Sequence, residues 1–362
     1  MDNDSKIVFI VSALLLMFGV VMIYSASAVY AFGRYGESLF FVTRHLLYLA
    51  LGGAAAVICM SVQPEFIRER SGTILLVSIA LLVAVLIPGI GSSIAGARRW
   101  IRIPFLGFQP SELAKYAVVI YLADFTSRKR YLIKNLYYGF LPPLFVTGLV
   151  GGLVFIEPDM GTAVAILFIG FMMLFVSGAK LRHLGTVAVT MFPALLAAAV
   201  CAPYRFRRLV AFCDPWKEAK GAGFQLIQSF IALGSGGIVG VGLGQSKQKL
   251  FYLPESHTDF IFAIIGEELG FIGTASVLIL FGVLVWFMMR ISFRIRDLFM
   301  SRVVLGIAML ISFEVIVNIG VSTGMFPTKG LPLPFISYGG SSLVGHMAAI
   351  GIVLNMGKEA GK

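Results

Sequence analysis

KLFYLPESHTDFIFAIIGEELGF, residues 249–271, passes from polar sequence into a long apolar span that keeps three carboxylates. Asp259 stands at the start of the span, and Glu267 and Glu268 follow about two helical turns deeper. Carboxylates are expensive at membrane depth, and those retained there usually mark a functional site. We expect Asp259 to act as a base at the water-facing end of a membrane-embedded site. Glu267 is expected near it, and Glu268 is expected to pair with another helix.

The composition is that of an integral membrane protein. Of the 362 residues, 58% are hydrophobic and 13% are charged, and the mean hydropathy is +0.92. Soluble proteins carry about 25% charged residues. Strands of membrane barrels alternate in polarity, whereas the apolar runs here are continuous, as in membrane helices. The sequence therefore predicts an all-α polytopic membrane protein, with residues 1–362 forming a single integral membrane domain.

About ten transmembrane helices are expected, since each crossing needs about 20 mostly apolar residues. Asp2 and Asp4 precede the first apolar run, which is too long for a secretory signal and should remain as an uncleaved anchor. Neither a disulfide framework nor a metal cluster is implied by Cys59, Cys201 and Cys213. The expected spans are 7–27, 40–62, 72–90, 112–126, 139–157, 160–178, 184–203, 259–289, 301–324 and 339–357.

The distribution of Lys and Arg among the short loops predicts the orientation. With the N-terminus in the cytoplasm, the cytoplasmic loops hold most of these residues, as the positive-inside rule requires. An even number of spans places both termini in the cytoplasm. Segment 203–257 then becomes a large extracytoplasmic loop between the seventh and eighth spans. Within this loop, residues 223–233, GFQLIQSFIAL, have the amphipathic pattern of a helix that lies in the membrane interface.

Residues 234–245, GSGGIVGVGLGQ, contain six glycines. They lack the spacing and the preceding strand of a nucleotide-binding fingerprint. Two interpretations remain open for them, close backbone packing or a flexible lid.

Polar residues also gather in the expected outer loops. Arg99 and its neighbours bracket Trp100, either as an interface anchor or as a surface that binds an anionic or sugar-bearing headgroup. Glu157 lies in the very short turn 156–162 on the same side as Asp259 and is a further site candidate. Its neighbour Asp159 is explained by helix capping.

Glu112 and Lys115 are three residues apart and share a helix face. Either they form a structural ion pair between helices, or Lys115 faces a cavity and contacts a substrate phosphate. In the ninth span Glu314 and Asn318 are expected to form hydrogen bonds between helices. The last outer loop has three prolines around Lys329, so it should be non-helical and lie beside protein or a wet cavity.

These polar groups suit chemistry on a lipid-linked anion. A transporter would more often place them near the midplane, between repeats, and we find no internal repeat. In group transfer from a pyrophosphate, a carboxylate deprotonates the attacking hydroxyl while Arg, Lys or a divalent ion stabilises the departing phosphates.

Several motifs together make the chain resemble the SEDS family (shape, elongation, division, sporulation), and most of all its cell-division member. The resemblance covers essentially all ten expected spans. The motifs are RRWI at 98–101, FQPSELAK at 108–115, EPDMGT at 157–162, GSGGIVGVGLGQSKQKLFYLPESHTDFIFAIIGEELG at 234–270 and FPTKGLPLPFISYGGSS at 326–342. The resemblance implies a peptidoglycan glycosyltransferase that polymerises lipid II outside the membrane. It also implies a class B penicillin-binding protein and other division proteins as partners.

The resemblance assigns roles to residues. Asp259, the acid of the HTDF motif, would be the catalytic base in an inverting single displacement from which undecaprenyl diphosphate departs. His257 would orient the loop rather than ligate a metal. The residues expected to bind the substrate are Arg99, Trp100, Glu112, Lys115, Glu157, His257, Lys329 and Ser337.

No cofactor is certain from the sequence, which leaves open whether a divalent cation, Mg²⁺ or Mn²⁺, assists the leaving group. Contacts with membrane lipids are expected, and none with nucleic acid. The expected location is the bacterial inner membrane, at the division septum. The rival interpretations are a lipid II flippase, a non-enzymatic scaffold, and an elongation or sporulation paralogue with the same chemistry.

Overall fold

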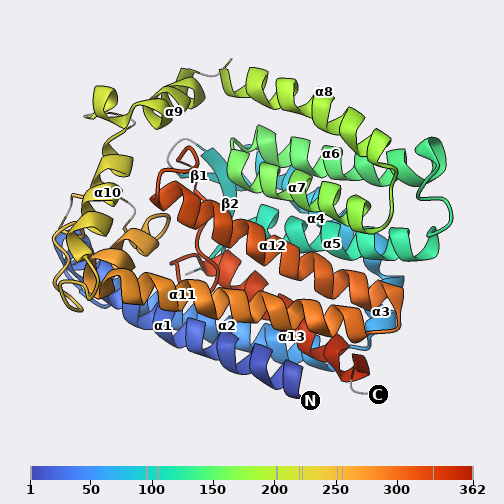
Figure 1. Cartoon of the computed structure of the whole chain (residues 1–362), viewed down its shortest axis with the longest axis horizontal. Helices are drawn as coiled ribbons and strands as arrows, with labels where there is room; N and C mark the ends of the chain where they lie inside the picture. The colour runs from blue at the N-terminus through green and yellow to red at the C-terminus, as the bar shows by residue number, and fades with distance from the viewer. Residues whose placement is uncertain are drawn as a thin grey trace.

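A computed structural model describes the chain except for residues 1, 95–96, 104–105, 201–202, 220, 222, 251, 255, 329 and 361–362. The described part is dominated by helices, which confirms the predicted fold class (Figure 1). The α-helices are α1 (Asn3–Tyr35), α2 (Phe40–Ser61), α3 (Pro64–Glu69), α4 (Ser71–Leu86), α5 (Pro110–Arg128), α6 (Leu141–Ile156), α7 (Met160–Val176), α8 (Leu181–Val200), α9 (Pro203–Cys213), α10 (Phe224–Gly236), α11 (Ile261–Arg294), α12 (Leu298–Ser322) and α13 (Gly340–Ala360). A π-helical turn, η1 (Leu136–Phe140), leads into α6, and a 3-10 turn, η2 (Pro215–Glu218), follows α9.

Each expected span overlaps one long helix of the described chain. Six helical segments are long and apolar enough to cross a membrane, and α4 and α7 are shorter apolar helices. The protein is a membrane protein on this composition, and the number of ten crossings stays a prediction. The six segments are α1, α2, η1 together with α6, α11, α12 and α13.

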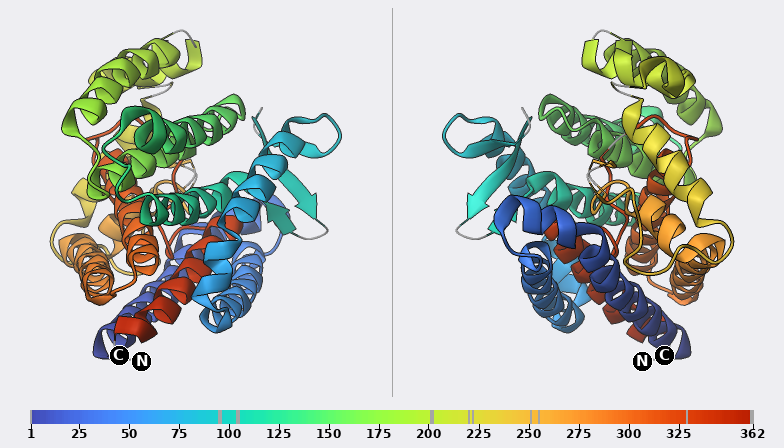
Figure 2. Two further views of the ribbon diagram at one scale, coloured as in Figure 1. Left: turned by 90° about the vertical axis from the view of Figure 1, so that its right-hand side faces the viewer. Right: turned by 90° about the vertical axis from the view of Figure 1, so that its left-hand side faces the viewer.

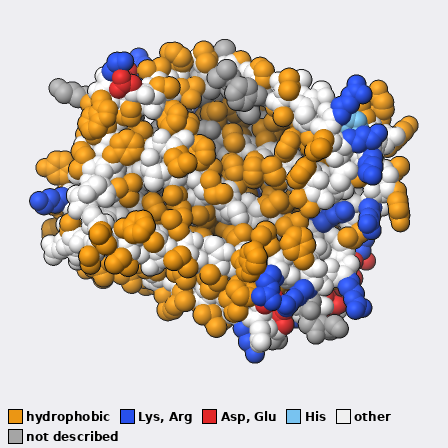
Figure 3. Space-filling model, viewed as in Figure 1, with side chains coloured by type: hydrophobic (Ala, Val, Ile, Leu, Met, Phe, Trp, Pro, Cys, Tyr) orange, Lys and Arg blue, Asp and Glu red, His pale blue; other side chains and the backbone are white. Residues whose placement is uncertain are grey.

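The helices form one bundle with α12 and α13 as the most enclosed of these six segments. Helices α1 and α2 lie on one side of the bundle, and α8 and α9 lie on the other (Figures 1 and 2). Both chain ends lie at the same end of the bundle, where Arg294 Nη1 is 2.7 Å from Asp4 Oδ2. Lys and Arg side chains gather at this end, whereas apolar side chains cover the middle of the visible face (Figure 3).

The expected outer loop between α4 and α5 contains a small antiparallel sheet that the sequence analysis did not predict. Its strands β1 (Gly91–Ile94), β2 (Ala97–Ile103) and β3 (Leu106–Phe108) pair in chain order. The register places Gly91 opposite Ile101 and Ile101 opposite Phe108, with a shift between Ser92 and Ser93. The sheet projects from the side of the bundle (Figure 2). It carries Arg99 and Trp100 on the same strand.

Helix α11 is broken at Gly270, whose φ of 65° and ψ of −160° only glycine adopts readily. The backbone groups released by this break pair with the glycine-rich segment 237–242. Such pairing is required at membrane depth, where an unsatisfied backbone group is costly. The four bonds run from Val241 N to Glu267 O (3.0 Å), Gly242 N to Glu268 O (3.0 Å), Phe271 N to Gly237 O (2.9 Å) and Ile272 N to Ile238 O (3.1 Å).

Of the two interpretations of the glycine-rich stretch, the structure shows close packing. A side chain at Gly236 would overlap the carbonyl oxygen of Gly266, and one at Gly240 would overlap that of Glu268. Two buried carboxylates of α11, Glu267 and Glu268, bind residues 246–249, the loop that comes after the glycine-rich stretch. Glu267 accepts hydrogen bonds from Ser246 Oγ and from Lys247 N (2.9 Å), and Glu268 pairs with Lys249 Nζ (2.8 Å) and accepts a bond from Ser25 Oγ on α1.

Residues 203–257 contain α9, η2 and α10. Helix α10 covers the stretch in which an amphipathic helix was predicted, and it buries Leu226 and Ile227. Its placement in a membrane interface stays a prediction.

Candidate active site

Asp259 lies two residues before the first residue of α11. Helix α11 begins at the end of the bundle opposite the chain termini (Figure 1). Its side chain is half-buried. A helix N-terminus favours a negative charge placed near it. The carboxylate lies against Gly330, where an added Cβ would be 3.1 Å from Asp259 Oδ2. The neighbouring Lys329, a predicted substrate contact, lies outside the described residues.

Hydrogen bonds join the segment that carries Asp259 to the loop between α12 and α13. Ser337 Oγ donates to Thr258 O at 2.6 Å and accepts from Leu333 N at 2.9 Å. Tyr338 N donates to His257 O at 2.9 Å. The hydroxyl hydrogen of Ser337 is therefore used within the protein, so this residue tethers the site. Its contact with a substrate stays a prediction.

His257 is buried among aromatic rings that come from three separate segments. Its ring centroid lies 5.7 Å from that of Tyr30, 4.5 Å from Phe41 and 5.9 Å from Tyr338. That His257 orients the loop stays a prediction. Among the described residues, no group of three or more His, Cys, Asp or Glu side chains is arranged to hold a metal ion.

Arg99 connects the small sheet to the turn between α6 and α7. Its Nε donates to Glu157 O at 3.0 Å, and its terminal nitrogen donates to Pro158 O. Pro158 has a φ of 30°, far from the usual proline value near −65°. Trp100 is half-buried and lies over Gly107 of β3, where an added Cβ would be 3.1 Å from the indole ring.

Glu157 lies in this turn, outside both helices, and is completely buried. Neither of its carboxyl oxygens has a hydrogen-bond partner among the described residues. Burial, with a further contribution from Asp159, raises its pKa from 4.5 to about 8, and Arg99 opposes the rise only in part. A pKa of about 8 favours the protonated form of this side chain at neutral pH. Asp159 caps α7, as predicted, by accepting from Thr162 N, and it also accepts from Gln109 Nε2 at 3.0 Å.

The turn between α6 and α7 reaches the Asp259 region through Gly161. A Cβ at Gly161 would lie 3.1 Å from Leu331 Cγ and 3.6 Å from Gly330 O. Gly330 in turn contacts Asp259. The structure thus gathers Arg99, Glu157, Asp259 and the 330–338 loop into one region.

Glu112 and Lys115 lie in the interior between α5, α12 and α13. Lys115 is completely buried, and its Nζ lies 2.8 Å from Glu112 Oε2 and bonds to Glu314 Oε1. Glu314 Oε2 is 2.6 Å from His346 Nε2. Of the two alternatives stated for Lys115, these contacts are those of the structural ion pair. Its binding to a substrate phosphate stays a prediction.

The prediction that Glu314 and Asn318 form hydrogen bonds between helices is right for Glu314 and wrong for Asn318. Glu314 bonds to neighbouring helices, as expected, whereas Asn318 Nδ2 donates to the backbone oxygens of Asp259 (3.0 Å) and Leu331 (2.8 Å). The sequence shows Asn318 four residues after Glu314 on a membrane helix. It does not show the path of the two loops that contain the acceptors, Asp259 O and Leu331 O.

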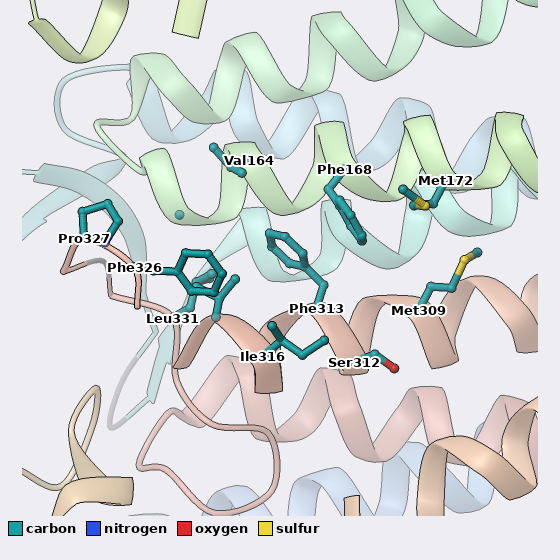
Figure 4. A pocket seen from close by; sticks show the side chains of 12 residues that line it. Val164, Phe168, Met172, Met309, Ser312, Phe313, Ile316, Phe326, Pro327 and Leu331 are labelled. Atoms are coloured by element: carbon teal, nitrogen blue, oxygen red, sulfur yellow. The ribbon is translucent and has the colours of Figure 1, made fainter. Parts of the chain in front are cut away.

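A groove of about 450 Å³ runs between α7 and α12 and reaches the loop beside Asp259. Its lining is almost entirely apolar. Phe168 of α7 and Phe313 of α12 stack on each other in this lining, with ring centroids 4.4 Å apart (Figure 4). Phe326, Pro327 and Leu331 line its end nearest Gly330. The groove therefore connects an apolar path along two helices with the polar region that holds Asp259.

Comparisons with known proteins cover nearly the whole chain. A family model described as "Cell cycle protein" (FtsW, RodA and SpoVE) matches residues 5–362. The probable peptidoglycan glycosyltransferase FtsW of Geobacter sp. strain M18 is 41% identical, over 98% of this chain and 97% of its own length. Stage V sporulation protein E of Bacillus subtilis is 42% identical over 98% of this chain and 97% of its own length.

Two solved structures share the fold. One, described as showing the structural coordination of polymerization and crosslinking by a peptidoglycan synthase complex, matches with a TM-score of 0.78 and 29% identity. The rod shape determining protein RodA of Thermus thermophilus matches with a TM-score of 0.74 and 28% identity. Each match covers 98% of this chain and 97% of the other.

Proposed function

This chain belongs to the family of cell cycle proteins that includes FtsW, RodA and SpoVE, and on that premise we propose that it is a peptidoglycan glycosyltransferase that polymerises lipid II. The observation that carries the proposal is the position of Asp259. Its half-buried carboxylate stands at a helix start, against Gly330, where an apolar groove meets a polar region.

In the proposed step Asp259 is the general base. It takes the proton of the acceptor sugar hydroxyl, and the oxygen attacks the anomeric carbon of the donor. The bond from that carbon to the diphosphate breaks, and its electron pair leaves with the diphosphate oxygen. Attack from the opposite face inverts the configuration of the donor carbon.

The groove between α7 and α12 suits the lipid part of such a substrate. Its lining, with Phe168 and Phe313 at the centre, offers apolar surface to a polyprenyl chain. Its end at Pro327 and Leu331 would place the attached diphosphate near Asp259. A protonated Glu157 adds no negative charge near that anion.

Similarity to these proteins also supports proposals for the partners of this chain and for its location in the cell. The synthase complex that shares the fold coordinates polymerization with crosslinking, and we propose a class B penicillin-binding protein as the crosslinking partner of this chain. Names among the relatives include both FtsW and a sporulation protein, so a division role is proposed with sporulation as its alternative. The basic end of the bundle, where Arg290 and Arg294 lie beside the N-terminus, is proposed to face the cytoplasm.

The test uses purified protein and lipid II. Asp259→Asn keeps the size of the side chain and removes the base, so polymerisation should fall by at least about 100-fold while insertion and partner binding persist. Asp214→Asn is the matched control, because Asp214 pairs with Lys217 at the surface. Wild-type turnover by Asp259→Asn would overturn the assignment. Transbilayer movement of lipid II without polymer, unaffected by this change, would indicate a flippase instead.

A further inference from the structure

Asn318 of α12 is a buried amide whose two hydrogens both go to loop backbone. Its side chain is 1% exposed. Nδ2 donates to Asp259 O at 3.0 Å and to Leu331 O at 2.8 Å. One acceptor belongs to the segment that carries the proposed base, and the other lies one residue from Gly330, against which that base rests.

The two segments that Asn318 joins have little regular structure of their own. Residues 327–339 contain three prolines, which cannot donate backbone hydrogen bonds, and Phe335 has a φ of 64°, which is unfavourable for a residue with a side chain. The segments are joined to each other by Ser337 and Tyr338. Asn318 fixes both of them to a helix.

Helix α12 is a suitable reference for such a contact because it is one of the most enclosed helices of the bundle. A side chain that leaves its surface has few alternative positions, since neighbouring helices restrict it. An error of about 1 Å in the position of a reacting group can reduce a rate by about 100-fold.

We propose that Asn318 is a positioning residue for the reaction, because its amide sets the distance between the Asp259 backbone and the 330–338 loop. The inference rests on the proposed function of Asp259. Asn318 itself does not touch the reacting atoms. It acts through the two carbonyl groups that it holds.

The chain contains a matched control for this arrangement. Asn355 of α13 is also buried, and its Nδ2 donates to two backbone oxygens, Cys59 O at 3.0 Å and Val62 O. These acceptors lie at the end of α2, far from Asp259 in the bundle (Figure 1). Removal of either amide leaves two carbonyl groups without a donor, so the structural damage should be similar.

The experiment compares Asn318→Leu with Asn355→Leu in the full-length protein, with Asp259→Asn in the same series. Lipid II polymerisation gives kcat and KM, thermal unfolding gives Tm, and hydrogen exchange reports on residues 254–260 and 330–338. Asn318→Leu should lower kcat by at least about tenfold with little change in KM. It should also speed exchange in both segments. Asn355→Leu should lower Tm to a similar degree and change neither kcat nor this exchange.

If Asn318→Leu does not fold, Ser337→Ala provides the second variant, since it removes the bond to Thr258 O and leaves α12 intact. It should give the same loss of kcat and faster exchange, to a smaller degree. Unchanged exchange in both segments, or an equal loss of kcat in Asn355→Leu, would overturn the inference. Polymerisation by Asp259→Asn would instead overturn the proposed function, while the exchange result would still decide whether Asn318 holds the two segments together.

Discussion

At the scale of single residues, three carboxyl groups at one end of the molecule differ in their surroundings rather than in their chemistry. Asp159 caps a helix and has its hydrogen bonds satisfied. Glu157, two residues earlier, is completely buried and has no hydrogen-bond partner in the described part of the chain. Asp259 is half-buried and lies at a helix start. Because a base must be within reach of the substrate, only Asp259 of the three, which is half-buried where the other two are buried, suits the role of an accessible base.

The first prediction concerns the pH dependence of stability at Glu157. A carboxyl group whose pKa rises on folding binds its proton more tightly in the folded chain than in the unfolded chain. Stability is then lost as the pH rises from the ordinary value of 4.5 to about 8. Glu157→Gln removes this loss because the amide stays neutral. Melting temperatures in detergent should therefore show the variant gaining on the wild type across this interval, with no further gain at higher pH.

Two charged groups near Glu157 shift its pKa in opposite directions. Asp159 favours the protonated form, and Arg99, which bonds the carbonyl groups of the turn, favours the ionised form. A difference in melting temperature that stays constant with pH would show that Glu157 is not protonated by burial. A difference that shrinks as the pH rises would show that Arg99 or another cation stabilises the carboxylate.

At the scale of secondary structure, the break in α11 explains the glycine-rich stretch before it. The segment 237–242 pairs with the backbone of residues 267–272 like a strand, although neither segment is a strand. Side chains would prevent the close approach at Gly236, Gly240 and Gly270. The break also shortens the first part of α11 to the few residues between Asp259 and Gly270. The base therefore directly precedes a short helical segment that is held by the glycine-rich loop.

The second prediction tests whether stability depends on a glycine at the break in α11 more than on a glycine elsewhere in the same helix. In Gly270→Ala the new Cβ would overlap Gly240 N and lie 2.5 Å from Ile238 O, and φ would remain strained. The backbone strain alone is worth about 1–3 kcal/mol, so the variant should unfold at a distinctly lower temperature. Gly282→Ala is the control in the same helix, because nothing lies within 4 Å of its added Cβ. A Gly270→Ala variant as stable as Gly282→Ala would show that the break is not required.

The features that the sequence analysis missed are those in which two backbone segments form hydrogen bonds with each other. The long apolar runs predicted the helices correctly because burial in a membrane leaves a clear pattern in one segment alone. The sheet at 91–108 escaped prediction because its strands are three to seven residues long and their alternation is weak. The pairing of the glycine-rich segment with α11 depends on two segments meeting in space. Composition allowed close packing or a lid, and only the arrangement of the helices decides between them.

At the scale of the whole molecule, the polar residues that the sequence selected form two sets of contacts. Asp259, Arg99, Glu157, His257 and Ser337 gather at one end of the bundle. Glu112 and Lys115, also predicted to bind the substrate, pair among α5, α12 and α13 with Glu314 and His346, and their contact with a substrate stays a prediction. The spacing of Glu112 and Lys115 predicted their pairing. Their depth could not be predicted, since it depends on which faces of three helices meet.

The buried group of Glu112, Lys115, Glu314 and His346 joins α5, α12 and α13. His346 Nε2 lies 2.6 Å from Glu314 Oε2, and Nδ1 lies 2.6 Å from Ser342 O. Lys115 therefore stands between two carboxylates, and His346 links Glu314 to α13. Such a group joins three helices only while each charge keeps its partner, because an unpaired buried charge is far more costly than a buried pair.

The third prediction tests the pairing of Lys115 with Glu112 and Glu314 together with the role of Lys115. Lys115→Met leaves an excess negative charge in the interior and should cost about 3–5 kcal/mol of stability, seen as a lower melting temperature. Adding Glu112→Gln removes one carboxylate and leaves Glu314 with His346, so the double variant should be more stable than Lys115→Met alone. This order cannot arise if the two side chains act independently. If Lys115→Met instead keeps its melting temperature and loses only polymerisation, Lys115 contacts the substrate and the three helices are held by other means.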